Sequence, residues 1–339
     1  MELELSVQDG LPAVVRWPLA GSSIAEQTGT ATRFAEGLNC DIIRDIAGQL
    51  STELEDWLSW ANLYAGRQAT HISLTLYDAP RGDYWARVAC LSSGAAYRID
   101  LGLGSIAAVL YLGSLIEEAI VTAAQTGAMR FMLLRDMGDF AKTGSVPLFL
   151  SPSGQPLQRL VVDAMLLMFL HEVSHAFGAH MLWAPLQTES LNRKAAETDA
   201  DWGAGLLFMR RLFEQKVPPQ VAAKRLYTSA SLNHIALELN RVPSSRYHLP
   251  PQRLLATLMG AEAGARLSAI DLAILTQVQR DLLPALSNVL GTLPSQLGLK
   301  HDWFNDPAAV EDRQQFEQFT VPRVHEMRAE MGVRRVAPM

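Results

Sequence analysis

Residues 161–175 read VVDAMLLMFLHEVSH, an apolar run followed by the pattern HExxH. On an α-helix, residues four apart project from one face, so His171 and His175 can bind a single cation. Glu172 is adjacent to the first histidine and can reach a water molecule beside that cation. This spacing is typical of a zinc site and predicts a metallopeptidase helix at the centre of the fold.

A second segment supplies the carboxylates that such a site needs. Glu197 follows His175 by 22 residues, within a helix-like stretch at 192–215, and Asp201 comes one turn later on the same face. A hydrolytic zinc ion usually has three protein ligands and one open position, and two histidines with one carboxylate form a known set. We therefore predict Glu197 as the third ligand. Asp201 suits the role of holding one ligand imidazole in place.

This second stretch is also rich in small residues, which would let its backbone approach the HExxH helix closely enough for Glu197 to reach the metal. The small residues are Ala195, Ala196, Ala200, Gly203 and Ala204.

His180 is an alternative metal ligand. It follows Gly178, but it comes one residue earlier than the third histidine of the metzincin pattern HExxHxxGxxH, and Met181 occupies that position. On a continuous helix His180 would point away from His171, although Gly178 can break the helix and redirect it. A site without metal also stays open, in which His171 and His175 are core histidines bonded to the backbone.

The combination of HExxH with Glu197-Thr198-Asp199-Ala200-Asp201 resembles the gluzincin metallopeptidases, in particular the HtpX-type branch. The resemblance implies zinc ligands at His171, His175 and Glu197, a general base at Glu172, and a supporting aspartate at Asp201. Soluble HExxH proteins of phages and mobile elements, including the Lit-type peptidases, have a similar Gly-x-His after the motif, here Gly178-Ala179-His180. HtpX-type enzymes are membrane proteins, whereas the most apolar stretch of this chain, 102–116, is too short to span a bilayer.

These residues predict a zinc-dependent endopeptidase, a hydrolase in which Glu172 acts as general base on a metal-activated water. Tyr247 or His248, in the segment 246–253, is the candidate donor to the oxyanion. HtpX-type proteins have a similar His-Pro-Pro segment followed by Arg, but here Leu249 is inserted after the histidine. The alternative is a catalytically silent protein in which zinc only stabilises a binding or regulatory module.

Composition restricts the partners. The net charge is −6, and no basic stripe is present, so neither nucleic acid nor an anionic membrane is an expected partner. We expect a protein or peptide substrate and allow for a regulatory partner protein. The two cysteines, Cys40 and Cys90, exclude a disulfide framework and fit a reducing compartment. The first residues lack the features of a signal peptide, so a cytoplasmic location is predicted.

The expected fold class is α+β, with a mostly helical, zincin-like catalytic core and a small antiparallel sheet in the N-terminal half. Alternating apolar residues predict strands at 71–77, 84–91 and 96–102. We expect an N-terminal α+β part (1–150), a helical zinc-binding part (151–300) and a C-terminal helix with a tail (301–339). Other helices are expected at 30–65, 103–126, 221–238, 253–263, 268–290 and, exposed, at 310–331.

Overall fold

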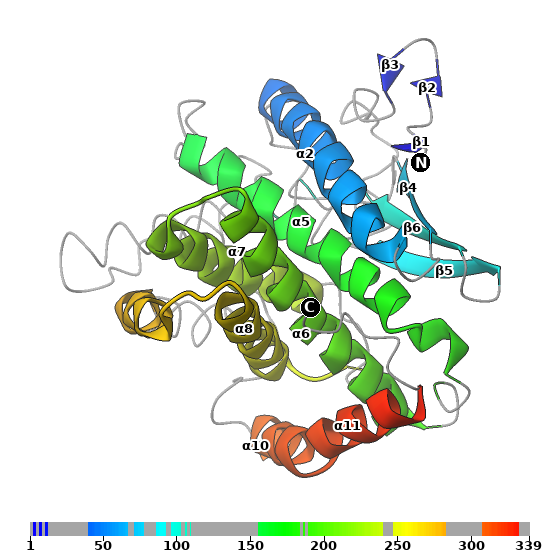
Figure 1. Cartoon of the computed structure of the whole chain (residues 1–339), viewed down its shortest axis with the longest axis vertical. Coiled ribbons are helices and arrows are strands. Elements are labelled where there is room, and N and C mark those ends of the chain that lie inside the picture. Colours follow the sequence, from blue (N-terminus) through cyan, green and yellow to red (C-terminus); the bar gives the residue numbers. More distant parts are fainter. Residues whose placement is uncertain are drawn as a thin grey trace, which may run out of the picture.

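The computed structural model of the 339-residue chain is mostly helical, with a small four-stranded sheet and a separate pair of short strands (Figure 1). It describes residues 3–4, 7–8, 11–12, 40–66, 71–77, 86–92, 96–102, 106, 109, 155–183, 186, 189–239, 247–282 and 307–331. Within these residues the coarse α+β expectation is confirmed.

The sheet is mixed, and the expectation of an antiparallel sheet was wrong for two of its three pairings, which are parallel. Its strand order is β1 (Leu3–Glu4), β4 (His71–Tyr77), β6 (Ala96–Gly102) and β5 (Ala86–Ser92). β5 and β6 form an antiparallel pair, but β6 lies between β5 and β4 and runs parallel to β4, and β1 also runs parallel to β4. The alternation of apolar residues identified these strands, but their order depends on contacts distant in sequence. A separate antiparallel pair joins β2 (Val7–Gln8) and β3 (Leu11–Pro12).

One face of the sheet belongs to the core. Ile72 lies opposite Tyr97 and Leu74 opposite Ile99, and all four side chains are buried. Helices α2 (Cys40–Gly66) and α5 (Gln155–Phe177) pack against the sheet (Figure 1). Trp57 and Trp60 of α2 are buried, with exposed fractions of 0% and 4%.

Further helices follow α5, and the prolines between them begin helices rather than end them. After the short 3-10 turn η2 (His180–Leu182), α6 spans Ser190–Glu214, α7 spans Pro219–Leu239 and α8 spans Pro250–Leu267. Proline fits the first turn of a helix because the missing N–H has no partner there. For this reason α8 begins before the predicted residue 253. The next helix covers 272–282.

Glycines let α6 and α8 pack with their backbones in close contact. A Cβ added at Gly260 would lie 1.7 Å from the carbonyl oxygen of Trp202, and one at Gly205 would lie 1.9 Å from that of Thr257. No side chain larger than hydrogen fits at either position without moving a helix. This close packing sets the distance between the two helices.

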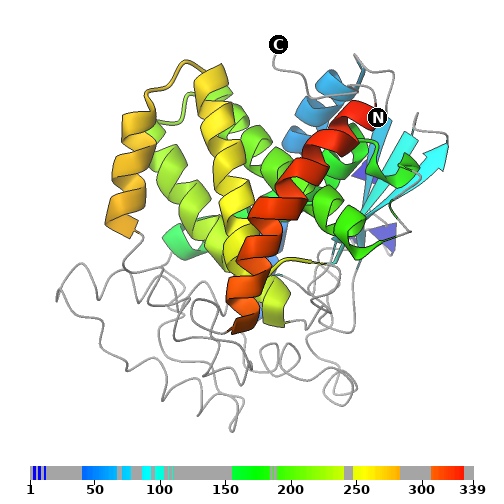
Figure 2. The same cartoon turned by 90° about the horizontal axis from the view of Figure 1, so that it is seen from below.

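The C-terminal segment is half-buried and interrupted, not the single exposed helix that its polar composition predicted. It consists of α10 (Pro307–Gln315), the π-helical turn η4 (Phe316–Thr320) and α11 (Val321–Glu330). Phe316, Thr320, Val324 and Met327 are buried, and the segment packs against α6 (Figure 2). Most polar residues of this segment are on its outer face, but Asp312 and Thr320 are buried.

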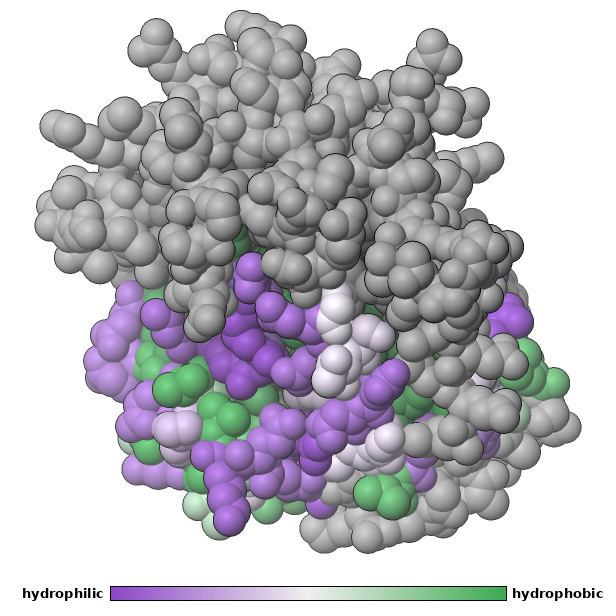
Figure 3. Space-filling view, turned by 90° about the horizontal axis from the view of Figure 1, so that it is seen from above, coloured by the Kyte–Doolittle hydropathy of each residue, from purple (hydrophilic) through white to green (hydrophobic). Residues whose placement is uncertain are grey.

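A single large cluster of buried apolar residues runs from Ile46 to Leu282 and crosses the boundary predicted at residue 150. Helix α5 lies within it. Residues 157–177 are long and apolar enough to cross a membrane, but 94% of that window is buried inside the molecule, as in the core helix of a soluble protein. On the face shown in Figure 3, the described residues mix hydrophilic and hydrophobic side chains.

Several expected segments fall outside the described residues. These are residues 30–39, residues 283–290 of the helix predicted at 268–290, and the tail from 332. The helix predicted at 103–126 is also outside them, except for the buried helical residues Ile106 and Val109.

Candidate metal centre

Helix α5 brings the two motif histidines together. His171 and His175 are buried, and their Nε2 atoms lie 3.1 Å apart. Their rings meet nearly edge to face, with centroids 4.7 Å apart. The i, i+4 spacing therefore places two ring nitrogens close together on one face of the helix, as predicted from the sequence.

Glu197 of α6 completes a three-residue group. Its Oε2 lies 3.1 Å from His171 Nε2, and its Oε1 lies 3.6 Å from His175 Nε2. Among the described residues, His171, His175 and Glu197 form a group whose ligand atoms lie within 4.8 Å of one another. Zinc bonds of about 2.0–2.1 Å in a tetrahedron place neighbouring ligand atoms about 3.3 Å apart. The donor set and its spacing thus fit a zinc ion with three protein ligands.

The small residues of α6 explain how Glu197 reaches this position. A Cβ added at Gly203 would lie 2.5 Å from Ser174 Oγ of α5, so the two helices touch where the glycine lies. Ala195, Ala196, Ala200 and Ala204 are buried along the same helix. The sequence-based expectation of a slim helix agrees with these contacts.

His171 is held by a carboxylate that is itself held by an arginine. Asp201 Oδ1 lies 2.8 Å from His171 Nδ1, without the alignment of a hydrogen bond, and Arg253 of α8 donates two hydrogen bonds of 2.8 and 2.9 Å to Asp201. Burial alone would lower the pKa of His171, but the charges of Asp201 and Glu197 outweigh it and raise the pKa to about 10. Asp201 thus lies beside His171 Nδ1, the contact that its predicted supporting role requires.

His175 has a different partner, His180. The helix ends at Phe177, Ala179 takes the left-handed conformation (φ 52°), and η2 then turns the His180 ring back toward α5. Its Nδ1 lies 2.8 Å from His175 Nδ1, on the side of that ring opposite the Nε2 that faces Glu197. His180 thus contacts the nitrogen of His175 that faces away from Glu197, and it is not a member of the three-residue group. The structure does not bring it to the position expected of the alternative metal ligand.

His180 is connected in turn to the C-terminal helix. Its Nε2 lies 2.9 Å from Asp199 Oδ2, and Arg328 of α11 donates to the other carboxylate oxygen of Asp199 at 2.7 Å. Burial lowers the pKa of His180, although Asp199 opposes this shift. The imidazole is therefore neutral at neutral pH.

Glu172 is buried beside the group and shares a contact with the sheet. Burial raises its pKa to about 7, while His171 and a backbone hydrogen bond from Val88 of β5 act in the opposite direction. A carboxyl group that titrates near neutrality can both accept and return a proton. The burial of Glu172 and its pKa of about 7 are compatible with the general base that the sequence predicted.

The two predicted oxyanion donors have different surroundings. His248 is buried, and both its nitrogens have partners, Asp312 Oδ1 at 2.8 Å and Thr320 Oγ1 at 2.9 Å. These contacts fasten it to the C-terminal segment. Tyr247 lies beside Arg253, the arginine that donates to Asp201. The Arg253 guanidinium is 5.2 Å from the centroid of the Tyr247 ring.

Sequence reasoning gave no role to Asp199 or Arg328. Asp199 stood inside the quoted motif, but its partner Arg328 is 129 residues away along the chain, so no spacing pointed to it.

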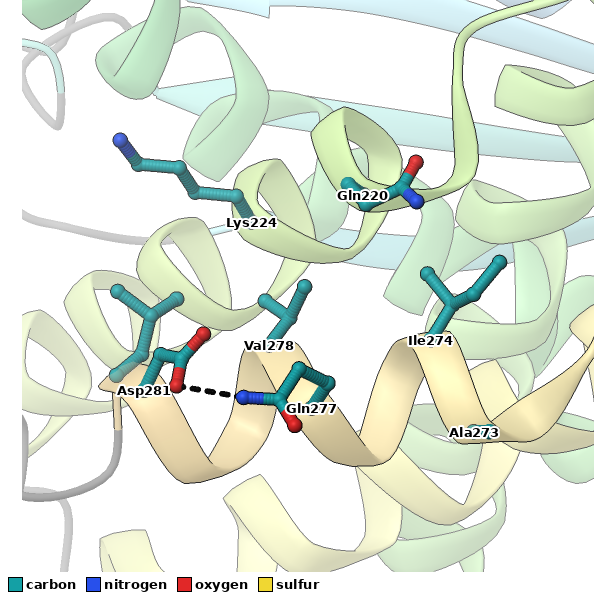
Figure 4. Close-up of a pocket in the computed structure, with 8 residues that line it drawn as sticks. Gln220, Lys224, Ala273, Ile274, Gln277, Val278 and Asp281 are labelled. Atoms are coloured by element: carbon teal, nitrogen blue, oxygen red, sulfur yellow. Dashed lines mark hydrogen bonds between the residues drawn. The ribbon is translucent and has the colours of Figure 1, made fainter.

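A separate hollow of about 540 Å³ lies between α7 and the helix at 272–282, and none of the candidate site residues lines it (Figure 4).

Comparisons with models of protein families, with curated proteins and with solved structures found no match.

Proposed function

We propose that the protein is a zinc-dependent endopeptidase with a zincin-like core. The observation that carries this proposal is the convergence of His171, His175 and Glu197 at tetrahedral spacing, with Glu172 adjacent on the same helix. A structural zinc site is closed by four protein ligands, whereas this group has three among the described residues, which would leave the fourth coordination position to a water. The resemblance to gluzincins noted in the sequence supports the same interpretation.

Each residue has a distinct part in the reaction. His171, His175 and Glu197 would hold the zinc ion, which supplies Lewis-acid chemistry to the water and to the scissile carbonyl. Glu172 takes a proton from the attacking water and returns it to the leaving amine. Asp201, itself held by Arg253, orients His171. Tyr247 is the remaining candidate for the oxyanion donor.

The substrate proposed for this site is an extended peptide. β5 is the outer strand of the sheet within the described residues, and the backbone of Val88 contacts Glu172. A peptide added beside β5 would form backbone hydrogen bonds and pass next to the general base. The proposed location is the cytoplasm, and a regulatory partner protein is compatible with this arrangement.

Metal analysis combined with a cleavage assay tests the proposal. Purified wild-type protein should contain about one zinc per chain and cleave an unstructured protein such as casein. Glu172→Gln should keep the zinc and lose cleavage, whereas His175→Ala and Glu197→Ala should lose both. Zinc without cleavage in the wild type would support the alternative, a binding or regulatory protein stabilised by zinc. Absence of zinc from the wild type would refute the metal centre.

A further inference from the structure

The two candidate ligand histidines are supported in different ways. His171 contacts a carboxylate directly, whereas His175 contacts a second histidine that intervenes before the carboxylate. This second chain of contacts runs from His175 through His180 and Asp199 to Arg328. It connects the metal centre to the C-terminal helix α11.

Metal ligation would fix which ring nitrogen of His175 and of His180 carries a proton. If Nε2 of His175 gives its lone pair to the metal, its Nδ1 carries the proton and donates to Nδ1 of His180, 2.8 Å away. Nε2 of His180 must then carry a proton, which it donates to Asp199 Oδ2 at 2.9 Å. A ligand histidine whose second nitrogen is held in this way has both its tautomer and its ring orientation set.

The position of His180 is built into the surrounding backbone. Its ring lies directly over Gly178, where an added Cβ would be 2.3 Å from His180 Nε2. The left-handed conformation of Ala179 makes the turn that places the ring there. Only 1% of the His180 side chain is exposed, so its two ring nitrogens depend on protein partners and not on solvent.

Helix α11 supplies Arg328, the last residue in this series of contacts. The Arg328 guanidinium contacts Asp199 and lies 4.4 Å from the ring centroid of Trp202. Trp183, which follows η2, donates to Glu330 Oε2 at 2.8 Å, so α11 also fixes the turn that carries His180. Figure 2 shows this helix crossing the molecule beside the helices of the core.

We propose that His180, Asp199 and Arg328 are positioning residues that hold His175 in its metal-binding form and make helix α11 part of the metal centre. The inference rests on the proposed metal site, which it deepens. It assigns the C-terminal helix a role in metal affinity, although no residue of that helix belongs to the ligand group.

Cobalt binding to the full chain tests this inference, because Co²⁺ reports its coordination through its visible spectrum. His180→Phe keeps a ring but has no nitrogen, and we expect about 10–100-fold weaker affinity with an altered spectrum. His180→Asn retains an acceptor near the position of Nδ1 and should recover part of the loss. Gly178→Ala should weaken binding by displacing the ring, and Arg328→Gln by releasing Asp199.

Arg313→Gln is the matched control, since Arg313 is an exposed arginine on α10 of the same C-terminal segment. It should leave both affinity and spectrum unchanged. Circular dichroism confirms that each variant is folded, and Arg328→Gln and Gly178→Ala carry the test if His180→Phe does not fold. Wild-type affinity and spectrum in the His180 and Arg328 variants would overturn the inference while leaving the proposed function intact. A wild-type protein that binds no Co²⁺ or Zn²⁺ would overturn both.

Discussion

At the scale of single residues, the candidate centre joins each ligand histidine to an aspartate and each aspartate to an arginine. Asp201 and Arg253 support His171, and Asp199 and Arg328 support His175 through His180. Buried carboxylates and guanidinium groups are costly to leave unpaired, so this pairing is a condition of building the site inside the core.

Zinc affinity should rise with pH. The pKa of His171 is raised to about 10 in the metal-free protein, so its imidazole carries a proton at neutral pH. Zinc must displace that proton, and apparent affinity should therefore increase about tenfold per pH unit between roughly pH 6 and 8. Competition with a chromophoric chelator measures this slope. An affinity independent of pH would show that His171 is not protonated before zinc binds.

Asp201→Asn should weaken both zinc binding and the fold. We expect about 10–100-fold lower zinc affinity because His171 loses its support. We also expect a loss of about 3 kcal/mol in the free energy of unfolding because Arg253 stays buried without its carboxylate partner. Chelator competition and urea unfolding measure the two effects. Asp281→Asn, at an exposed position, is the control, and equal behaviour of the two variants would contradict the account.

The sequence predicted the group of candidate ligands because that part of the site depends on helix spacing. His171 and His175 are one turn apart, and Glu197 lies on a helix whose small residues were visible in the sequence. The contact between His180 and His175 depends on the left-handed backbone conformation of Ala179. Glycine or asparagine usually takes this conformation after a helix, so the alanine in the sequence did not indicate it. Arg328 is placed by tertiary packing alone.

At the scale of elements, the close packing of α6 and α8 determines whether Arg253 can reach Asp201. Gly205, Gly260 and Gly264 occupy points where an added Cβ would lie within 2.6 Å of a carbonyl oxygen of the facing helix. Sequence periodicity identified both helices but not this contact. The need for glycine at these positions arises only when the backbone of the facing helix packs against them. The same holds for the sheet, whose strands were predicted while their order was not.

Gly260→Ala should destabilise the protein by about 3 kcal/mol or more, because its methyl group collides with the backbone of Trp202 and forces the helices apart. Gly48→Ala is the matched control on α2. Nothing lies within 4 Å of the added Cβ there, and alanine's higher helix propensity should stabilise the protein by about 0.5–1 kcal/mol. Urea unfolding of both variants measures the difference. Stability changes of the same sign would contradict the packing described here.

At the scale of the whole molecule, the centre joins parts of the chain that lie far apart in sequence. α5 and α6 supply the three candidate ligands, β5 contacts the proposed general base, and α8 and α11 supply the arginines that bind Asp201 and Asp199. Metal binding should therefore stabilise the fold as a unit. We expect about 2.7 kcal/mol of stabilisation at a free zinc concentration 100 times the dissociation constant.

Thermal unfolding with and without zinc measures this coupling. The midpoint should rise with zinc concentration and return to its starting value after chelation. His175→Ala should show no such rise. A wild-type midpoint that does not depend on zinc would show that the metal does not bind the folded chain.

Zinc-edge X-ray absorption of the purified wild-type protein tests the central claim most directly, because it reports the ligands themselves. We predict a four-coordinate zinc with two imidazole ligands and oxygen ligands at about 2.0–2.1 Å. Loss of one imidazole in His175→Ala would assign that ligand. A sulfur ligand, a shell of water oxygens alone, or a wild-type imidazole count that His175→Ala does not change would contradict the account.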